Sequence, residues 1–146
     1  MVRQGPSSDD VHDIVFFVRP ARDDVPESCP GRDFLNGCPD KVRATLRAVL
    51  VAVASAPPKR FAGGGYWEAM HGDMTGWFEV RVGGPHRTHY RLFCLLDYAA
   101  QGMEKPLLVV VDGRVKPFRT VLGSSDYAAI RKLGEEYWAA NPRSVA

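Results

Sequence analysis

Three strand-like segments follow one another in the middle of the chain, and their spacing constrains the fold more than any other feature. They occupy residues 77–82, 89–96 and 107–111 and are rich in β-branched and aromatic side chains. Because the links between them are short, we expect them to pair as an antiparallel meander. The third segment is apolar on both faces, which predicts a place at the centre of the sheet.

Alternation within the first two segments sorts their side chains onto two faces of the expected sheet. The apolar face carries Phe78, Val80, Val82, Tyr90, Leu92, Cys94 and Leu96. The opposite face carries Trp77, Glu79, Arg81, His89, Arg91 and Phe93. A basic segment, residues 112–120, follows the third strand. We therefore expect a cationic surface in which Arg81 and Arg91 lie on rigid strands and Lys116 and Arg119 lie at its end.

The N-terminal half of the chain predicts one strand and one long helix. Residues 11–18 are β-branched and aromatic and predict the first strand, whereas the prolines and acids of residues 20–33 predict a loop. A short helical turn is expected at 33–36. A helix then begins at Pro39, because proline suits the first helical position, and its apolar stripe continues to residue 54.

Residues 59–76 are rich in glycine and predict an irregular connection. The triple glycine at 63–65 is not a phosphate-binding loop, because no Gly-Lys-Ser/Thr follows it. A C-terminal helix is expected to start at 123–126 and to end before Pro142. The order of elements predicts one small α+β domain over residues 1–146, with residues 1–10 frayed. Its sheet should be mostly antiparallel, with about four strands.

Composition places the chain among soluble globular proteins, with 45% apolar and 25% charged residues. No apolar run approaches the roughly 20 residues that span a membrane, and no signal peptide precedes the first strand, so we expect a cytoplasmic protein. Residues 1–40 hold 4 Lys and Arg against 8 Asp and Glu, and residues 41–146 hold 15 against 9. The basic part, with net charge +6, is compatible with a polyanionic partner and equally with a solvated basic face.

The odd number of cysteines predicts reduced thiols. Cys94 lies on the apolar face of a strand and is expected in the core. Cys29 and Cys38 flank a short loop and lack two further ligands at suitable spacing, so neither a metal site nor any other cofactor is expected.

The cationic surface suits a phosphodiester, because guanidinium groups bind phosphate in a planar fork. Cleavage of RNA without a metal needs a base for the 2′-hydroxyl, cations for the developing charge and an acid for the 5′-oxygen. Candidates for the acid and base are His86, His89, Lys116 and Tyr127. Candidates for charge stabilisation are Arg91 and Arg119, with Arg81 behind them and Arg87 and Arg114 as further substrate contacts.

Each of these residues also has a structural interpretation. Glu79 and Arg81 alternate on one face and could form an ordinary ion pair. His89 could be a solvated residue at the rim. Asp112 and Gly113 could form a hairpin turn, which would make Lys116 and Arg119 charges that protect an edge strand. Spacing alone does not choose between the two interpretations.

The chain resembles the RelE/ParE/HigB superfamily of bacterial toxins, in particular the phage-derived HigB-like branch. The similarity runs from about Phe34 to Tyr137. Gly-Trp-Phe-Glu-Val-Arg at 76–81 is similar to the family's Gly-Leu-Trp-Glu-Leu-Arg strand, and Tyr-Arg-Leu-Phe at 90–93 is similar to its Tyr-Arg-Val-Phe strand. Lys-Pro-Phe-Arg-Thr at 116–120 and the following helix resemble the family's Lys-Lys-Thr segment and last helix.

This resemblance implies a toxin of a type II toxin–antitoxin pair that cuts mRNA on the ribosome without a metal. It implies a small helix-turn-helix antitoxin as partner, and it matches Arg91, Lys116 and Arg119 to the family's basic site residues. The chain departs from the family in its long acidic N-terminal arm and in having Asp112 where a histidine would follow the fourth strand. Two alternatives stay open: a gyrase inhibitor of the ParE type without nuclease activity, and an inactive relative that binds only an antitoxin or nucleic acid.

Overall fold

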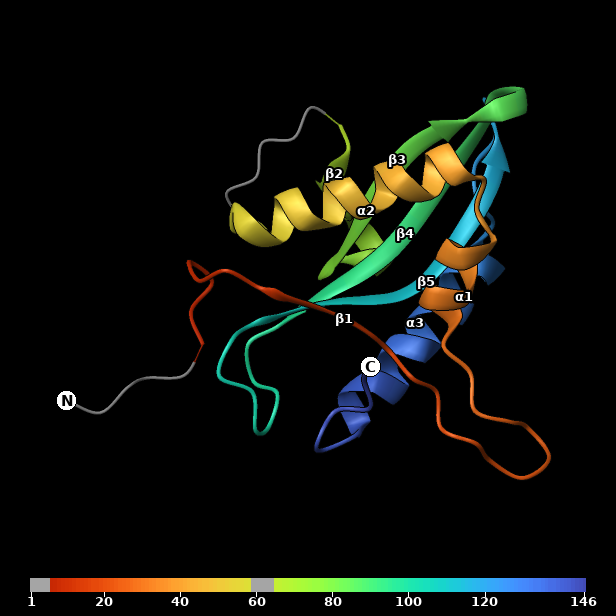
Figure 1. Cartoon of the computed structure of the whole chain (residues 1–146). Helices are drawn as coiled ribbons and strands as arrows, with labels where there is room; N and C mark the ends of the chain where they lie inside the picture. The colour runs from red at the N-terminus through yellow and green to blue at the C-terminus, as the bar shows by residue number, and fades with distance from the viewer. Residues whose placement is uncertain (1–5, 59–64) are drawn as a thin grey trace.

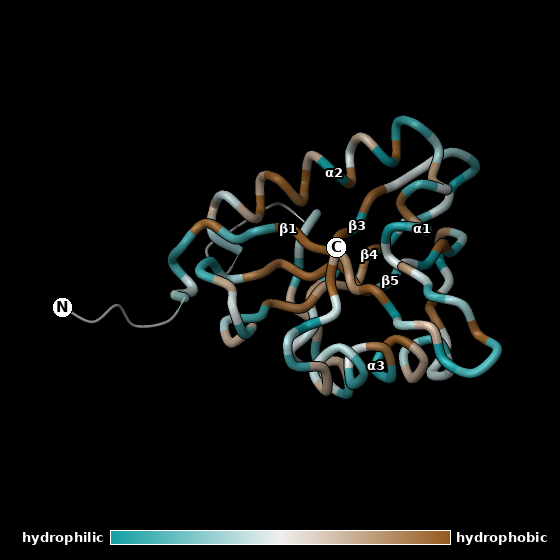
Figure 2. The backbone as a smooth tube through the Cα atoms, turned by 60° about the horizontal axis from the view of Figure 1, so that its bottom comes forward, coloured by the Kyte–Doolittle hydropathy of each residue, from teal (hydrophilic) through white to brown (hydrophobic). Residues whose placement is uncertain are grey.

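The computed structural model describes residues 6–58 and 65–146 as an open mixed sheet with α-helices on both faces (Figure 1). Within these ranges, five strands are ordered β1-β5-β4-β3-β2. Two helices, α1 and α2, cover one face, and α3 covers the other (Figures 1 and 2). None of the described helices is both long and apolar enough to cross a membrane.

The predicted meander is present and is longer than expected. It consists of β3 (Trp77–Gly84), β4 (Thr88–Asp97) and β5 (Leu107–Pro117), which pair antiparallel in that order. The central strand is β4, and the apolar β5 lies between β4 and β1. The third predicted strand, β5, is buried as expected, but it lies one position away from the centre of the sheet.

The two outer strands were only partly predicted. The first strand is shorter than expected, β1 (Asp13–Phe16), and pairs parallel with β5, so that the sheet is mixed. The second, β2 (Trp67–Ala69), lies in the expected irregular connection and pairs antiparallel with β3. Trp67 accounts for this strand, because its buried ring stacks on Phe78 with ring centroids 5.0 Å apart. The irregular connection predicted for residues 59–64 and the fraying predicted for residues 1–5 both lie outside the described residues.

Both predicted helices form, and a further one was missed. They are α2 (Asp40–Ser55), capped by Pro39, and α3 (Ser124–Ala139). The missed helix, α1 (Pro30–Gly37), begins within the expected loop at 20–33, and only its second half was predicted as a turn. Close packing explains its position, because a Cβ on Gly31 would lie 2.8 Å from the Val110 side chain.

The two faces of the sheet carry separate apolar clusters. Side chains of α1 and α2 pack on Val80, Leu92, Cys94 and Val110, all of which are buried. Across the sheet, α3 packs on a second set that includes Trp77, Phe93, Leu95, Val109 and Val111. The burial of Cys94 confirms that prediction. The second cluster covers only one end of its face, which leaves the other end of the strands to the charged side chains described next.

Candidate functional site

Three arginines lie side by side across the meander, on the face that α3 covers in part. Arg81 on β3 is directly opposite Arg91 on β4, and Arg91 is directly opposite Arg114 on β5. We call these residues the arginine row. Like charges in directly opposite positions repel each other, so such a row needs compensating groups.

Acidic side chains lie one step along the strands and supply this compensation. Glu79, which is opposite Phe93, accepts from Arg81 at 3.1 Å and from Arg91 at 3.3 Å. Asp112, on the other side of Phe93, pairs with Arg114 at 2.6 Å. At the ends of the row, Glu68 lies 3.1 Å from Arg81, and Asp126 of α3 lies 3.5 Å from Arg114.

A β-bulge between β4 and β5 makes this arrangement possible. Up to Val110 the register pairs Cys94 with Val110, but Phe93 pairs with Asp112, so Val111 is the extra residue. Without the extra residue, the alternation of β5 would place Arg114 and Lys116 on the face of α1 and α2. The bulge therefore brings both cations onto the face of Arg91.

On the side away from the acids, His89 of β4 is directly opposite Lys116 of β5. The His89 ring stacks on Phe118, with centroids 4.3 Å apart. The ammonium of Lys116 donates a hydrogen bond to the carbonyl oxygen of Thr120. Desolvation, followed by the charges of Lys116, Arg91 and Arg81, lowers the pKa of His89. Desolvation and the charges of Arg91 and Arg81 likewise lower the pKa of Lys116, and Glu79 opposes this shift.

Arg91 is the least exposed of the three residues in the arginine row. Its side chain is 13% exposed, against 37% for Arg81 and 27% for Arg114. Its Nε is buried and has no hydrogen-bond partner in the part of the chain that the structure describes. A hollow of about 300 Å³ opens beside it, lined by Arg81, His89 and Arg91 together with Gly65, Val82 and Gly83. Arg91 thus contributes both to the wall of the hollow and to the buried part of the site.

The structure thus brings together most of the predicted site. Arg81, His89, Arg91, Arg114 and Lys116 lie in adjacent positions on three strands. Lys116 is within β5 and 8% exposed, so the hairpin turn considered for Asp112 and Gly113 is wrong. Gly113 is required in the strand, because a Cβ there would lie 2.1 Å from the Phe34 ring.

Other predicted residues lie at the margin or apart. Arg119 is exposed in the turn after β5, with a positive φ of 64°. Arg87 lies over the Phe118 ring, with its guanidinium carbon 6.0 Å from the centroid. His86 is exposed in the turn between β3 and β4. Tyr127, at the start of α3, packs edge-on against Phe93, with centroids 6.3 Å apart.

Sequence reasoning missed the role of Glu79, which it considered only as a partner of Arg81. The signal was present, because a glutamate at 79 alternates with Arg81 and must face the strand that carries Arg91. Phe118 was also missed. Its contact with His89 depends on the turn after β5, which no local pattern predicts.

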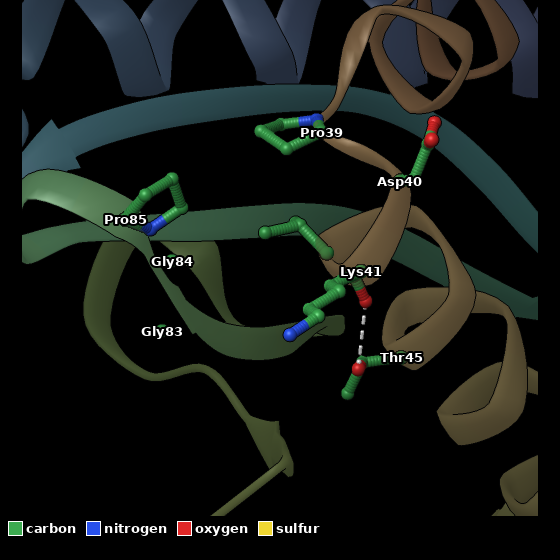
Figure 3. A pocket seen from close by; sticks show the side chains of 8 residues that line it. Pro39, Asp40, Lys41, Thr45, Gly83, Gly84 and Pro85 are labelled. Carbon is green, nitrogen blue, oxygen red and sulfur yellow. Dashed lines mark hydrogen bonds between the residues drawn. The ribbon is translucent and has the colours of Figure 1, made fainter.

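A pocket larger than this hollow lies elsewhere (Figure 3). It measures about 440 Å³ and lies between the start of α2 and the end of β3, where Pro39, Lys41, Thr45, Gly84 and Pro85 contribute to its wall. The hydrogen bond from the Thr45 hydroxyl to the Lys41 carbonyl oxygen belongs to the helix itself. The wall of this pocket includes neither an arginine of the row nor His89. Over residues 6–58 and 65–146, no three His, Cys, Asp or Glu side chains are grouped so that they could hold a metal ion.

Compared with known proteins, the chain matches no family model, no curated protein and no solved structure. The site must therefore be interpreted from its own geometry.

Proposed function

We propose that this protein is a ribonuclease toxin of a type II toxin–antitoxin pair, which cuts mRNA on the ribosome without a metal and so stops translation. The observation that carries this proposal is the direct opposition of His89 and Lys116 next to the arginine row. An imidazole, an ammonium and a largely enclosed guanidinium are the base, the acid and the charge-stabilising group that phosphodiester transfer needs.

The lowered pKa of His89 favours the neutral form of its ring, and this form can accept the proton of the 2′-hydroxyl. The 2′-oxygen then attacks the adjacent phosphorus, and the bond from phosphorus to the 5′-oxygen breaks. Lys116 donates a proton to that leaving oxygen. The products are a 2′,3′-cyclic phosphate and a 5′-hydroxyl. His89 takes up one proton in this step and Lys116 gives one.

Arg91 has the role of holding the phosphate and opposing the charge that develops on it. Its partly buried position strengthens such an interaction, because the local dielectric is lower than in water. Glu79 fixes the guanidinium by accepting from both Arg81 and Arg91. Glu79 is thus a positioning residue.

The arrangement of elements supports a RelE-like fold for this protein. β1, two helices and the short β2 precede the meander, and the last strand of the meander, β5, lies beside β1. Together with the motifs at 76–81 and 90–93, this arrangement is why we favour a toxin over an unrelated RNA-binding domain.

Induced expression in a bacterial host tests the proposal. We expect growth to stop and newly formed mRNA 5′ ends to fall within translated frames. A variant with His89 and Lys116 both replaced by alanine should abolish both effects at equal soluble yield. Growth arrest with intact mRNA and altered DNA supercoiling would instead favour a gyrase inhibitor, and absence of both would favour an inactive binding protein.

A further inference from the structure

A second hollow lies on the same face of the molecule, beside the start of α3. It measures about 290 Å³, and its wall includes Met70, Asp73, Met74, Tyr127 and Arg131. The segment after β2 and the short 3-10 helix Gly72–Met74 form one side, and the first two turns of α3 form the other. None of these residues takes part in the reaction proposed above.

The first turn of α3 joins this hollow to the arginine row. Tyr127 lines the hollow and packs against Phe93, which is two residues from Arg91 on β4. Asp126, next to Tyr127, pairs with Arg114 of the arginine row at 3.5 Å. Residues two apart on a strand are separated by roughly 6.6 Å, so Phe93, which Tyr127 contacts, lies about that far along β4 from Arg91.

The side chains of the hollow suit a flat, polar-edged ligand. Tyr127 is half-buried and offers an aromatic ring, and the Met70 and Met74 thioethers are polarisable apolar surfaces. Arg131 donates from Nη1 to the Met74 sulfur at 3.7 Å and forms no ion pair with any described acid. Asp73 is exposed and forms no ion pair with a described cation, Arg131 included.

We propose that this hollow binds a nucleobase of the RNA next to the cut site, with guanine as the preferred base. This inference rests on the proposed function. Guanine offers two adjacent N–H donors that match the two oxygens of a carboxylate, and its O6 and N7 accept from an arginine fork. Asp73 and Arg131 supply these complementary groups on opposite walls, and Tyr127 supplies the stacking surface.

Binding is tested first without any cleavage. Backbone amide resonances are followed by NMR while the 5′-monophosphates of guanosine, adenosine, cytidine and uridine are added separately, with inorganic phosphate as a further probe. The guanosine nucleotide should shift amides at 70–74 and 124–131 at the lowest concentration, and phosphate should shift only those near the arginine row. Equal effects of the four nucleotides, or no shifts at 70–74, would overturn the inference.

Two variants separate the proposed contacts from folding. Asp73→Asn and Arg131→Gln should each weaken guanosine nucleotide binding by at least about fivefold, because one good base contact is worth 1–3 kcal/mol. Lys132→Gln removes the neighbouring exposed charge on α3 and should leave binding unchanged. Unchanged binding in both Asp73→Asn and Arg131→Gln would contradict the assignment even if the wild type binds guanosine nucleotide.

Mapping of cut sites then distinguishes the two proposals. If the wild type cuts mRNA with a guanine bias that Asp73→Asn loses, both stand. If it binds guanosine nucleotide but cuts no mRNA, the base site stands and the nuclease function fails. If it cuts with a base preference that neither variant changes, the nuclease function stands and the base site fails.

Discussion

Replacement of Arg91 by alanine is the sharpest test of the site, because the structure predicts a large loss of activity with a small loss of stability. A donor aimed at the charge of the transition state contributes about 3–4 kcal/mol, which corresponds to a roughly 10²- to 10³-fold decrease in cleavage rate. Arg91→Lys keeps the charge but loses the planar fork and the buried Nε, so we expect a loss of about tenfold.

The stability cost of Arg91→Ala should be small, because Glu79 keeps its ion pair with Arg81. Breaking a buried ion pair can cost about 3–5 kcal/mol when the remaining charge is left without a partner. Here Glu79 retains Arg81 at 3.1 Å, and the repulsion of Arg91 by its two neighbours in the arginine row is removed. We therefore expect a decrease in the free energy of unfolding of about 1–2 kcal/mol, or roughly 2–8 °C in melting temperature.

The assay compares mRNA cleavage and thermal unfolding of the two Arg91 variants with Arg47→Ala. Arg47 is an exposed arginine of α2 on the opposite side of the sheet, so it controls for the loss of one charge. Cleavage by Arg91→Ala within threefold of wild type would refute the reasoning. A fall in melting temperature much greater than expected would show that Arg91 acts through the fold.

Three further predictions concern the metal, the pH profile and the packing of α3. Cleavage should persist in EDTA where ribosomes remain intact and should leave 2′,3′-cyclic phosphate ends; a need for magnesium in the chemical step with 3′-hydroxyl ends would contradict the mechanism. Because the pKa of His89 is lowered from 6.5, the cleavage rate should fall in acidic solution with a midpoint below pH 6.5. A midpoint above pH 7 would exclude His89 as the base. Gly134→Ala should lower the free energy of unfolding by about 1–3 kcal/mol, because the added Cβ would lie 2.4 Å from Trp77 Cζ2. Gly37→Ala should not lower it, because the space around Gly37 is open. Equal melting temperatures for the two variants would contradict the packing argument.

The periodicity of apolar residues along the sequence predicted the central strands and the long helix. The alternation at 77–96 and the helical spacing at 42–53 each depend on one buried face, so both emerged correctly. The parallel pairing of β1 with β5 could not be predicted, because it joins segments far apart in the chain. The prolines and acids at 20–33 predicted a loop, but Pro30 begins a helix instead, and proline is compatible with either.

The candidate site was predicted in composition but not in geometry. Alternation placed Arg81 and Arg91 on one face, which the register confirms. Alternation did not show on which face of the sheet the side chains of Arg114 and Lys116 lie. The apolar run at 107–111 does not reveal which of its residues is the extra one in the bulge. The bulge becomes explicable only when the register with β4 is known, since Cys94 and Val110 must share one core while Phe93 and Asp112 face the other side.

The charges on this face of the sheet are unevenly distributed. Within the described residues, each arginine of the row has an acidic partner, so the row alone could be read as a self-compensated network. Glu68, Glu79 and Asp112, however, lie on one side of the row, and Lys116, on the other side, forms no ion pair with a described acid. Beyond desolvation, the charges of Arg91 and Arg81 still lower the pKa of both His89 and Lys116, so the potential there is positive in spite of Glu79. This uneven distribution supports our proposal that a phosphate binds between Arg91, His89 and Lys116, beside the two groups that could exchange protons with it.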